Sequence, residues 1–428
     1  MPHALAQAVE IATTALAVAG LGYFLAALAA ARVFLHQRRA PRAEFAPGAP
    51  ADRSSSVGWG SGASADRSSS VGWRPGVSIL KSLKGLDPGM MDAFRSHCRQ
   101  SYAGPFELLF GVASLRDPAV AAVEQLQAEF PERTIRLIEC PERLGTNGKV
   151  STLAQLAAHV QYDFLLINDS DITVSPHYLE RVMCCFAPAP RDAGKPPVGL
   201  VTALFRGRAH GPLLRGGLPS RLEALWIATD FQAGVLLAKV LEGGLHYGLG
   251  ATLAVSRAAL DRIGGLEPIA NYLADDYELG ARVAQAGYRV ELSAEVVETS
   301  VPAYGWRGFF DHQLRWARTI RGARPWGYAG LIFTHGLGWA LLNVLASGLS
   351  PLSLWLLGLS FFLRLAQAMT VGAEVLGDHE VLANLWLLPV RDAIAMGLWV
   401  AGFAGDTIVW RGERFTLKDG KLANMQRS

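Results

Sequence analysis

Two carboxylates stand one residue apart in the stretch YDFLLINDSDITV, directly behind a short apolar run. They belong to Asp169 and Asp171, which are separated by Ser170. Such a pair can hold a divalent cation with the phosphates it carries, accept a phosphoryl group, start a calcium loop, or end a strand in solvent. The surrounding sequence has to decide among these four kinds of chemistry.

A calcium loop of the EF-hand type does not fit this stretch. Counted from Asp169, Asp171 takes the third position of the loop and Glu180 takes the twelfth. The sixth position, where the sharp turn requires glycine, is occupied by Val174.

An aspartyl-phosphate enzyme is a stronger alternative. Asp169, Asp171 and Thr173 resemble the first motif of the haloacid-dehalogenase phosphatases, in which the first aspartate is a nucleophile. That motif usually opens its domain, and its assisting lysine follows. Here residues 77–168 already have an α/β pattern, and the conspicuous Lys149 lies upstream. The phosphatase is kept as an alternative function.

A clamp for a cation and a nucleotide-sugar explains more of the chain. A departing diphosphate needs its growing negative charge neutralised, and a cation held by carboxylates supplies that. Oxygen ligands on a short loop suit Mg²⁺ or Mn²⁺. Three of the seven lysines, Lys81, Lys84 and Lys149, precede the acidic pair at predicted strand or loop ends. They are candidates for contacts with donor phosphates, with ordinary solvated lysines as the alternative.

A second acidic pair occurs in NYLADDYELGARVAQAGY. Asp275 and Asp276 open a predicted helix whose apolar face includes Leu279 and Val283. Carboxylates at a helix start commonly act as caps. Two adjacent carboxylates in a cleft also repel each other, which raises one pKa and produces a usable general base.

A third candidate segment, FFDHQLRWARTIRGARPWGYAG, combines aromatic and basic residues. Trp306, Phe309, Phe310 and Trp316 alternate with Arg307, Arg315, Arg318, Arg321 and Arg324. This composition is typical of a helix at a bilayer surface. We therefore predict an interfacial helix over residues 306–326, which anchors the protein and lines the entry of a lipid acceptor.

Strands and helices that alternate along the middle of the chain must position these residues. Strands are predicted at Val77–Lys81, Glu107–Val112, Thr134–Glu139, Phe164–Asn168, Val198–Ala203 and Ala251–Ser256. Helices are predicted at Pro118–Phe130, Lys149–Val160 and Pro176–Phe186. This alternation indicates an α/β fold with a mostly parallel sheet that helices cover on both faces. Ligands bind beyond the carboxyl ends of such strands, which is where Asp169 and Asp171 stand.

The first 39 residues are expected to form a transmembrane anchor. Ile11–Ala31 carries no charge and is long enough to cross about 30 Å of hydrocarbon. Arg32 and further arginines follow it, whereas no Lys or Arg precedes it. This asymmetry predicts an external N-terminus and a cytosolic remainder. A cleaved signal peptide would have the opposite charge order.

Apolar segments return near the end of the chain. Pro325–Leu363 contains no Asp, Glu, Lys or Arg, and Ala346–Pro351 within it indicates a turn between two helices. Ala393–Ala404 is too short to span a bilayer and is expected to be interfacial or re-entrant. We predict membrane helices over 327–410 and a basic cytosolic tail over 411–428.

Composition sets further limits. Half of the residues are hydrophobic and the net charge is only +3, so nucleic acid is not an expected partner. The four cysteines show neither metal spacing nor a disulfide framework, which favours reduced thiols facing the cytosol. Residues 40–76 contain the duplicated segment ADRSSSVGW and are rich in Pro, Gly and Ser, which predicts a disordered tether.

Several ordered stretches together resemble one family, the membrane-bound ceramide glucosyltransferases and their bacterial relatives. These stretches are SILKSLKGLDP, GTNGKVSTL, NDSDI, VGLVTAL, LADDYELGARV and HQLRW, and the resemblance covers about residues 78–410. The residues of these motifs are most similar to those of the hopanoid-biosynthesis glycosyltransferases. The resemblance implies a GT-A (Rossmann-like) catalytic domain over residues 77–305.

The resemblance also implies roles for individual residues. Asp169 and Asp171 would bind a divalent cation and the donor, and Lys149 would bind the donor. Asp276 would be the catalytic base, and Asp275, the acidic residue before it, would lie on the acceptor and product side together with His312. Arg315 and Trp316 would wall the acceptor and product side.

Two positions depart from the pattern of the family. His312 stands where the last motif has Gln or Arg, so its contact with the diphosphate would depend on protonation. Ser114 stands where an aspartate near the nucleobase is expected, and Asp117 follows three residues later. Asp117 is therefore included among the donor-binding candidates.

These inferences predict a metal-dependent inverting glycosyltransferase of the inner membrane, with several crossings and a catalytic domain in the cytosol. It would move N-acetylglucosamine from UDP-N-acetylglucosamine to bacteriohopanetetrol. Alternatives are a glucosyltransferase from UDP-glucose to ceramide or diacylglycerol, and a processive polysaccharide synthase, for which too few crossings are present. A lipid-binding anchor without enzymatic activity is a further alternative.

Overall fold

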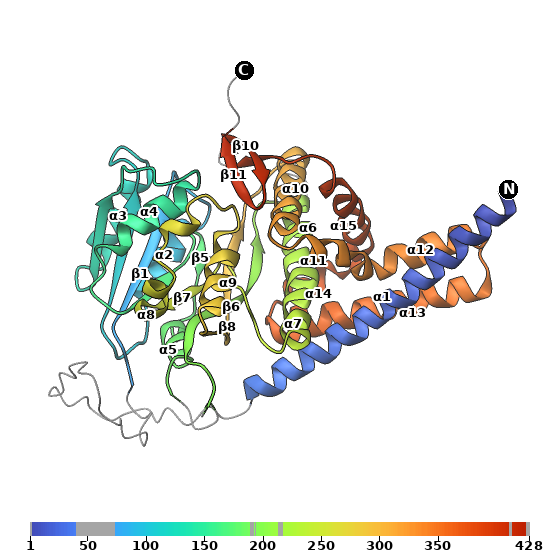
Figure 1. Ribbon diagram of the computed structural model, residues 1–428, viewed down its shortest axis with the longest axis horizontal. Coiled ribbons are helices and arrows are strands. Elements are labelled where there is room, and N and C mark those ends of the chain that lie inside the picture. Colours follow the sequence, from blue (N-terminus) through green and yellow to red (C-terminus); the bar gives the residue numbers. More distant parts are fainter. Residues whose placement is uncertain are drawn as a thin grey trace.

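The computed structural model describes residues 2–39, 73–188, 192, 194–212, 217–410 and 413–424. An eight-stranded sheet lies beside a group of helices, and a helical arm projects from that group (Figure 1). Most of the predicted tether, including the first copy of the duplicated segment, lies outside the described residues. Trp73, the last residue of the second copy, meets Phe164 edge-on with 5.5 Å between the ring centroids.

The large sheet has the strand order β3-β2-β1-β4-β7-β6-β8-β5. Its strands are β1 (Val77–Leu83), β2 (Phe106–Val112), β3 (Thr134–Glu139), β4 (Phe164–Ile167), β5 (Ile172–Thr173), β6 (Val198–Ala209), β7 (Leu253–Ser256) and β8 (Arg289–Val301). All six predicted strands are present. β8 was not predicted, although apolar and polar residues alternate along it as a half-buried strand requires.

The sheet is mixed but mostly parallel, because β7 and β5 run against the direction of the other six strands. β3, β2, β1 and β4 run parallel to one another, as predicted. β7 then enters antiparallel between β4 and β6, because the chain returns to the sheet through a long helix and a loop instead of a standard crossover. The carboxyl ends of β1 and β4 therefore lie at one edge of the parallel half.

Short helices cover the strands that carry the acidic stretches. They are α2 (Met90–Cys98), α3 (Ala119–Glu129), α4 (Gly148–Ala157), α5 (Tyr178–Met183), α8 (Arg257–Arg262), a 3₁₀ turn at Glu267–Ile269, and α9 (Asp275–Gln285). α4 packs on β1 and β2, and its start is fixed by Asn147, whose side chain accepts a hydrogen bond from the Val150 amide at 3.2 Å. This cap places Lys149 in the first turn of α4.

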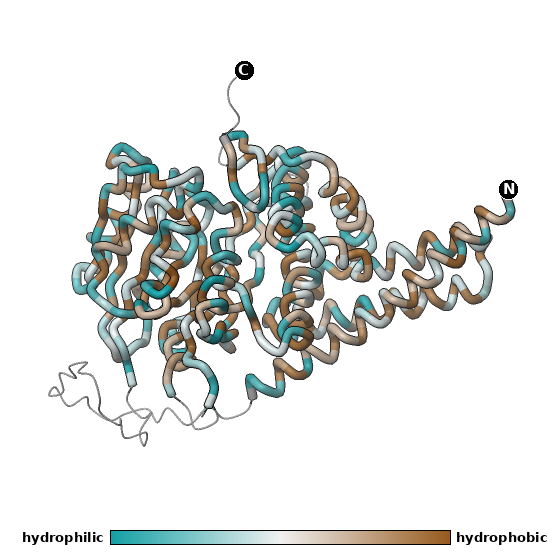
Figure 2. Tube along the Cα trace, viewed as in Figure 1, coloured by the Kyte–Doolittle hydropathy of each residue, from teal (hydrophilic) through white to brown (hydrophobic). Residues whose placement is uncertain are grey.

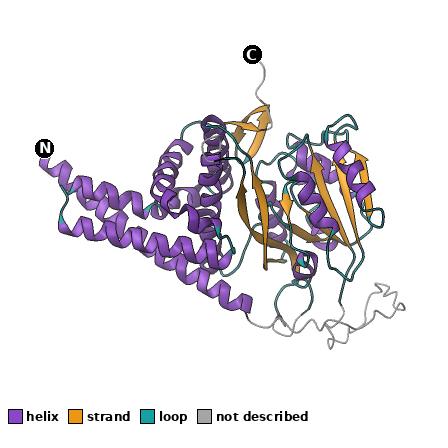
Figure 3. Cartoon of the chain, turned by 180° about the vertical axis from the view of Figure 1, so that it is seen from behind, coloured by secondary structure: helices purple, strands orange, loops and turns teal. Residues whose placement is uncertain are grey.

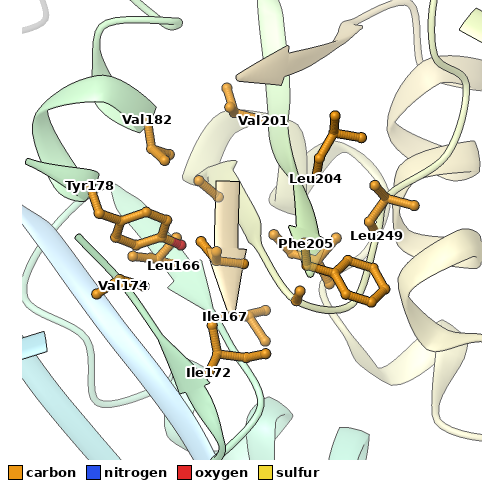
Figure 4. Packing of buried hydrophobic residues seen from close by; sticks show 14 of the residues in the cluster. Leu166, Ile167, Ile172, Val174, Tyr178, Val182, Val201, Leu204, Phe205 and Leu249 are labelled. Carbon is orange, nitrogen blue, oxygen red and sulfur yellow. The ribbon is translucent and has the colours of Figure 1, made fainter. Parts of the chain in front are cut away.

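A continuous core lies under the acidic turn that follows β4. Ile167 and Ile172, which flank that turn, both belong to the core together with Leu166 and Val174 (Figure 4). The aromatic ring of Tyr178 packs beside them. The polar turn is thus held from below by side chains that exclude water.

Longer helices form the second half of the molecule. They are α6 (Leu218–Trp226), η3 (Ile227–Phe231), α7 (Gln232–Leu241), α10 (Trp306–Ala323), α11 (Pro325–Gly330), η5 (Leu331–Thr334), α12 (Gly336–Ala346), α13 (Pro351–Ala368), η6 (Met369–Val375), α14 (Glu380–Asn384), η7 (Leu385–Leu387) and α15 (Leu388–Gly402). α1 (Pro2–Arg39) joins α12 and α13 in the projecting arm, seen from behind in Figure 3.

The arm is built as a tight helical bundle. A methyl group placed on Gly20 would lie 2.2 Å from the Cα atom of Gly336, so only glycine allows α1 and α12 to approach this closely. The predicted turn at residues 346–351 does separate α12 from α13. Apolar residues recur along this arm (Figure 2).

Four helices are long and apolar enough to cross a membrane, or up to five if a bent pair forms one span. They are His3–Arg38, Leu218–Leu241, Pro351–Val375 and Glu380–Gly402, and the bent pair joins Pro325–Thr334 to Gly336–Ala346. The length argument against a span near Ala393 was wrong, because the helical run continues well beyond the uncharged segment. Leu218–Leu241 was not predicted, and more than half of its most apolar window is buried within the protein.

The chain ends in a small antiparallel sheet of β9 (Thr407–Trp410), β10 (Glu413–Lys418) and β11 (Lys421–Asn424). Its backbone joins the segment before α9, where the Leu273 amide donates to the Gly420 carbonyl oxygen at 3.2 Å. This small sheet therefore lies beside the second acidic pair.

Candidate active site

The acidic turn after β4 begins at a residue that is fixed in place. Asn168 is almost fully buried, and its side-chain amide donates to the Tyr178 hydroxyl at 3.0 Å and to the Ala251 carbonyl at 2.7 Å. These bonds tie the end of β4 to α5 and to the loop before β7. The direction in which the next three residues leave the sheet is therefore set by the fold.

Asp169 contacts two of the predicted lysines in different ways. Its Oδ1 atom lies 2.8 Å from the Lys149 Nζ atom, and its backbone carbonyl accepts from the Lys81 Nζ atom at 3.0 Å. The Lys81 side chain is fully buried beneath the turn. Burial lowers the pKa of Lys81 to about 7, although the carboxylates of Asp171 and Asp169 oppose this shift. Lys81 thus supports the turn from below, whereas Lys149 reaches its carboxylate.

Asp171 contacts the end of β8. Its Oδ2 atom accepts from the Thr299 hydroxyl at 2.6 Å and from the Ser300 amide at 3.1 Å. Burial raises the pKa of Asp171, and the negative charge of Asp169 adds to that rise. Between the two, the Ser170 hydroxyl donates to Asp87 at 2.5 Å. β8 and Asp87 are supporting elements that the sequence interpretation did not include.

Lys149 joins the two acidic stretches of the sequence. Its Nζ atom lies 3.2 Å from the Asp275 Oδ2 atom as well as 2.8 Å from Asp169. Asn147, two residues earlier, donates to the Tyr272 carbonyl at 2.8 Å and so holds the loop before α9 against the start of α4. Burial lowers the pKa of Lys149, but the two carboxylates more than offset this, so the pKa lies above its ordinary value.

Asp276 lies in the first turn of α9, beside Asp275. Its Oδ1 atom accepts from the Tyr277 amide at 2.8 Å. Burial raises the pKa of Asp276 to about 6, with the negative charge of Asp275 adding to the shift and Lys149 opposing it. A methyl group on Gly250 would lie 3.1 Å from the Asp276 Oδ2 atom, so glycine at that position leaves space in front of the carboxylate.

Two further donor-side candidates lie apart from this cluster. Asp117 accepts from the Gly85 amide at 2.9 Å and from the Ala119 amide at 2.9 Å, so it caps α3 and fixes the loop after β1. Lys84 is exposed and pairs with Glu413 of β10 at 3.2 Å. In this arrangement both residues contact protein groups at the rim of the site.

Three of the predicted acceptor-side residues, His312, Arg315 and Trp316, lie together on α10, whereas the fourth, Asp275, lies on α9. The ring of Trp316 meets Trp226 edge-on at 5.1 Å between centroids and Phe231 at 5.6 Å. His312 lies one helical turn earlier and is 5.9 Å from the Trp316 ring. Arg315 is partly buried on the same helix. α10 therefore packs its motif residues against the helix that contains α6 and η3.

The sequence interpretation missed the carboxylate that holds this motif. Glu223 of α6 accepts from His312 Nδ1 at 2.9 Å, from the Gln313 side-chain amide at 3.0 Å and from the Tyr304 hydroxyl. Gln313 in turn accepts from buried Arg391 of α15 at 2.9 Å. The available signal was an acidic residue inside a mostly apolar helix, because a buried carboxylate needs donors.

The acidic residues of this cluster are possible ligands for a divalent cation. Among the described residues, no three His, Cys, Asp or Glu side chains are grouped so that they alone could hold a metal ion. Two carboxylates remain, of which Asp169 is 43% exposed. Mg²⁺ is commonly held by one or two carboxylates together with substrate phosphates and water. Asp169 and Asp171 therefore fit a cation that arrives with a phosphorylated donor, but not a site made of protein groups alone.

A family model matches almost the whole chain. The model describes glycosyl transferase family 21 and matches residues 14–423. The chain belongs to this family. It is therefore a glycosyltransferase related to the ceramide glucosyltransferases, and the predicted α/β GT-A class with an N-terminal apolar helix is confirmed.

Several proteins similar in sequence to this chain are named ceramide glucosyltransferases. A ceramide glucosyltransferase 3 from Caenorhabditis elegans is 24% identical over 80% of this chain and 73% of its own length. A ceramide glucosyltransferase from Komagataella phaffii is 34% identical over 24% of this chain and 21% of its own length. With its apolar helices, this family 21 member is a membrane protein.

Solved structures of more distant proteins were also matched. A mannosyltransferase from Pyrobaculum calidifontis in complex with GDP-Man and Mn²⁺ is 19% identical, with a TM-score of 0.49 over 92% of this chain and 99% of that one. A glucosyl-3-phosphoglycerate synthase from Mycobacterium tuberculosis in complex with Mg²⁺ and UDP is 14% identical, with a TM-score of 0.34 over 58% of this chain and 78% of that one.

Proposed function

We propose that this protein transfers a sugar from a UDP-sugar to a hydroxyl group of a membrane lipid, with inversion at the anomeric carbon. Asp276 is the general base, and Asp169, Asp171 and Lys149 lie on the side of the departing diphosphate. The observation that carries the proposal is the Lys149 ammonium, which contacts Asp169 and Asp275 at once. It places a cation between the donor-side carboxylate and the acidic pair that contains the base.

The protonation of Asp276 fits this role. A general base works best when its pKa lies near the working pH, because it is then both ionised and able to hold the proton it receives. The pKa of about 6 satisfies both conditions near neutral pH. Lys149 opposes the rise in the pKa of Asp276 and so keeps it in this range.

The chemical step balances with these groups. The lipid hydroxyl gives its proton to Asp276 while its oxygen forms a bond to the anomeric carbon from the face opposite the donor. The bond between that carbon and the diphosphate oxygen breaks, and the electron pair stays on the diphosphate. One carboxylate suffices because inversion needs no covalent sugar intermediate. Lys149 stabilises the negative charge that develops on the departing group.

A divalent cation would be held by Asp169 and Asp171 when the donor binds, and it would neutralise part of the diphosphate charge. The turn that carries the two carboxylates is already fixed by Lys81 from below and by Thr299 from β8. These contacts hold the turn in place before a donor binds. The chain thus supplies a rigid pair of ligands.

The acceptor side is assigned to α10. His312, Arg315 and Trp316 lie on a helix that packs against α6, α15 and the small C-terminal sheet. An acceptor that stays in the bilayer reaches the base as part of a nearly intramolecular encounter, which lowers the entropic cost of the reaction. We place the catalytic domain at the cytosolic face of the inner membrane, because arginines follow α1.

Donor and acceptor are proposed from the motif resemblance and from the relatives. The resemblance of the motif residues to hopanoid-biosynthesis glycosyltransferases favours transfer of N-acetylglucosamine to bacteriohopanetetrol. The relatives are named ceramide glucosyltransferases, which supports UDP-glucose and ceramide, or diacylglycerol, as the alternative pair. Both pairs require the same base, diphosphate side and membrane helix.

The test is a matrix of donors and acceptors with purified protein in lipid nanodiscs. UDP-N-acetylglucosamine and UDP-glucose are each combined with bacteriohopanetetrol, ceramide and diacylglycerol, with and without EDTA, and the lipids are analysed by mass spectrometry. We expect one glycolipid product, lost on chelation and restored by Mg²⁺ or Mn²⁺.

Other products would overturn specific parts of the proposal. Free phosphate without a glycolipid would favour the phosphatase, and lipid binding without turnover would favour an anchor protein. A glycolipid formed equally well in EDTA would remove the metal role of Asp169 and Asp171 while leaving the role of Asp276 intact.

A further inference from the structure

A buried carboxylate outside the family motifs holds the acceptor-side histidine in place. The Glu223 side chain is 4% exposed, and its Oε2 atom accepts hydrogen bonds from His312, Gln313 and Tyr304. Three donors on one oxygen are the means by which a protein keeps an ionised carboxylate in an apolar helix. The fold therefore supplies the hydrogen-bond donors that the buried carboxylate of Glu223 requires.

The three donors come from neighbouring turns of one segment. Tyr304 directly precedes α10, and His312 and Gln313 lie in its second turn. Glu223 lies on α6, which packs on β6 of the sheet. The carboxylate thus fixes the rotation of α10 about its own axis relative to the sheet domain. That rotation determines where His312, Arg315 and Trp316 point.

The network continues into the helix before the C-terminal sheet. Gln313 accepts from the Arg391 guanidinium at 2.9 Å, and that guanidinium also lies over the ring of Trp226 at 5.4 Å. Trp226 is in edge contact with Trp316. The carboxylate and the two tryptophans therefore link α6, α10 and α15 in one packed unit next to the acceptor side.

The contact also fixes which nitrogen of His312 carries a hydrogen. A carboxylate only accepts hydrogen bonds, so His312 Nδ1 must donate to Glu223. In the neutral ring Nε2 then carries the lone pair and accepts a hydrogen bond rather than donating one. In metal and triad sites the partner of one ring nitrogen sets the orientation and tautomer of the other in the same way.

We propose that Glu223 is a positioning residue for sugar transfer, which holds His312 with Nδ1 protonated so that Nε2 can accept a hydrogen bond from a hydroxyl group on the acceptor side. This inference rests on the proposed function for its kinetic consequence, but not for the histidine geometry. The related motif has Gln or Arg at the position of His312. The presence of histidine here is explained by its partner on another helix, Glu223 of α6.

A double-mutant cycle tests whether Glu223 acts through His312. Glu223→Gln, His312→Ala and the double variant are compared in nanodiscs with the lipid acceptor that the wild type uses. We expect Glu223→Gln alone to lower kcat about 10- to 100-fold, because a small displacement of a reacting group costs that much. KM for the lipid should stay within about threefold. In the His312→Ala background the same change should alter kcat by less than about twofold.

A second readout does not depend on turnover. Nitrogen-15 NMR of histidine-labelled protein separates Nδ1-protonated from Nε2-protonated rings, and the signal lost in His312→Ala identifies His312. We expect the Nδ1-protonated form in the wild type and a mixture in Glu223→Gln. If the wild type transfers sugar to no lipid, the proposed function fails while this spectrum still tests the positioning role.

Controls separate positioning from simple loss of a buried charge. Glu295 of β8 is equally buried and pairs with Arg181 at 2.7 Å, so Glu295→Gln should reduce stability without the loss of kcat. If Glu223→Gln does not fold, Glu223→Asp keeps the charge, shortens the side chain, and should give an intermediate kcat. Multiplicative losses in the cycle, or an unchanged His312 signal in the variant that folds, would overturn the proposal.

Discussion

The two sides of the site hold their charged groups in different ways. On the sheet side, Lys149 bridges Asp169 and Asp275, and the carboxylate of Asp169 is still partly open to solvent. On the helix side, Glu223 is buried and its Oε2 atom receives three protein donors. The sheet side keeps oxygens available for a phosphorylated donor and its cation. The helix side has its carboxylate fully occupied, and so it serves to orient other side chains.

This difference predicts which charges can be removed at which cost. In the proposed mechanism the groups on the sheet side take part in the reaction, so their loss should change the rate more than the stability. Charges on the protein rim, such as those that join the small C-terminal sheet to the site, should change neither by much. The loss of activity should therefore be largest for substitutions on the sheet side and smallest for those at the rim.

The largest effect is expected for Asp276→Asn. An amide cannot take the proton of the lipid hydroxyl, and general-base catalysis is worth about 10²- to 10⁴-fold. We expect kcat to fall by at least about 10²-fold with donor KM nearly unchanged. The exposed Asp261→Asn on α8 is the matched control and should keep full activity. A variant of Asp276 that retains transfer with wild-type kcat would refute its role as the base.

The same substitution should stabilise the folded protein near neutral pH. The folded-state pKa of about 6 lies above the ordinary value of 3.8, so ionised Asp276 weakens folding above pH 6. Removing the charge should therefore raise the free energy of unfolding by about 1 kcal/mol at neutral pH. The gain should shrink as the pH falls from 6 to below 3.8, where the wild-type carboxyl becomes protonated in both states. Chemical unfolding at several pH values measures this dependence.

A smaller effect is expected for Lys149→Gln, which removes the bridge between the two acidic stretches. Donor binding loses a cation near the diphosphate, so kcat/KM for the donor should fall about 10- to 100-fold. Lys195→Gln, which breaks an exposed pair with Asp192, is the control and should leave kcat/KM unchanged. Equal losses in both variants would mean that Lys149 acts only through general surface charge.

The pH dependence of the Lys149→Gln variant sharpens the comparison further. Lys149 opposes the rise in the pKa of Asp276, so its removal should raise that pKa above about 6. The wild-type rate should fall as the pH drops through about 6, because a protonated Asp276 cannot accept a proton. In the variant, this acid limb of kcat/KM should move to higher pH. An unchanged limb would place the titrating group elsewhere.

The sheet side could be predicted from the sequence because its chemistry is local. Asp169 and Asp171 follow a strand-like run, and Asp275 and Asp276 open a helix, so each pair shows its setting within a few residues. The contact of Lys149 with both pairs could not be derived from spacing, since it depends on how α4 and α9 meet. The burial of Lys81 was missed for the same reason. A lysine at a strand end looks exposed until the next turn of the chain covers it.

The helix side was harder to predict because its parts come from α6, α10 and α15. Glu223 and Arg391 are far apart in sequence, and each stands near an opposite charge on its own helix, Arg221 and Asp392. Only packing shows that Gln313 joins them. The position of β7 could not be predicted either, because its antiparallel entry depends on the long helix that precedes it.

The smallest effect is expected at the rim, for Glu413→Gln. Glu413 accepts from Lys84 at 3.2 Å and from Arg143 at 3.3 Å, and all three side chains are largely exposed. Exposed pairs contribute about 0–1 kcal/mol, so stability should hardly change. Releasing Lys84 toward the donor should lower donor KM by about twofold or less at low salt, and the effect should vanish at high salt because ions screen exposed charges. Glu129→Gln, which breaks the remote pair with Arg95, should not alter donor KM at either salt concentration. A tenfold change for Glu413→Gln would instead make the C-terminal sheet part of the donor site, and the division between an open sheet side and an inert rim would be wrong.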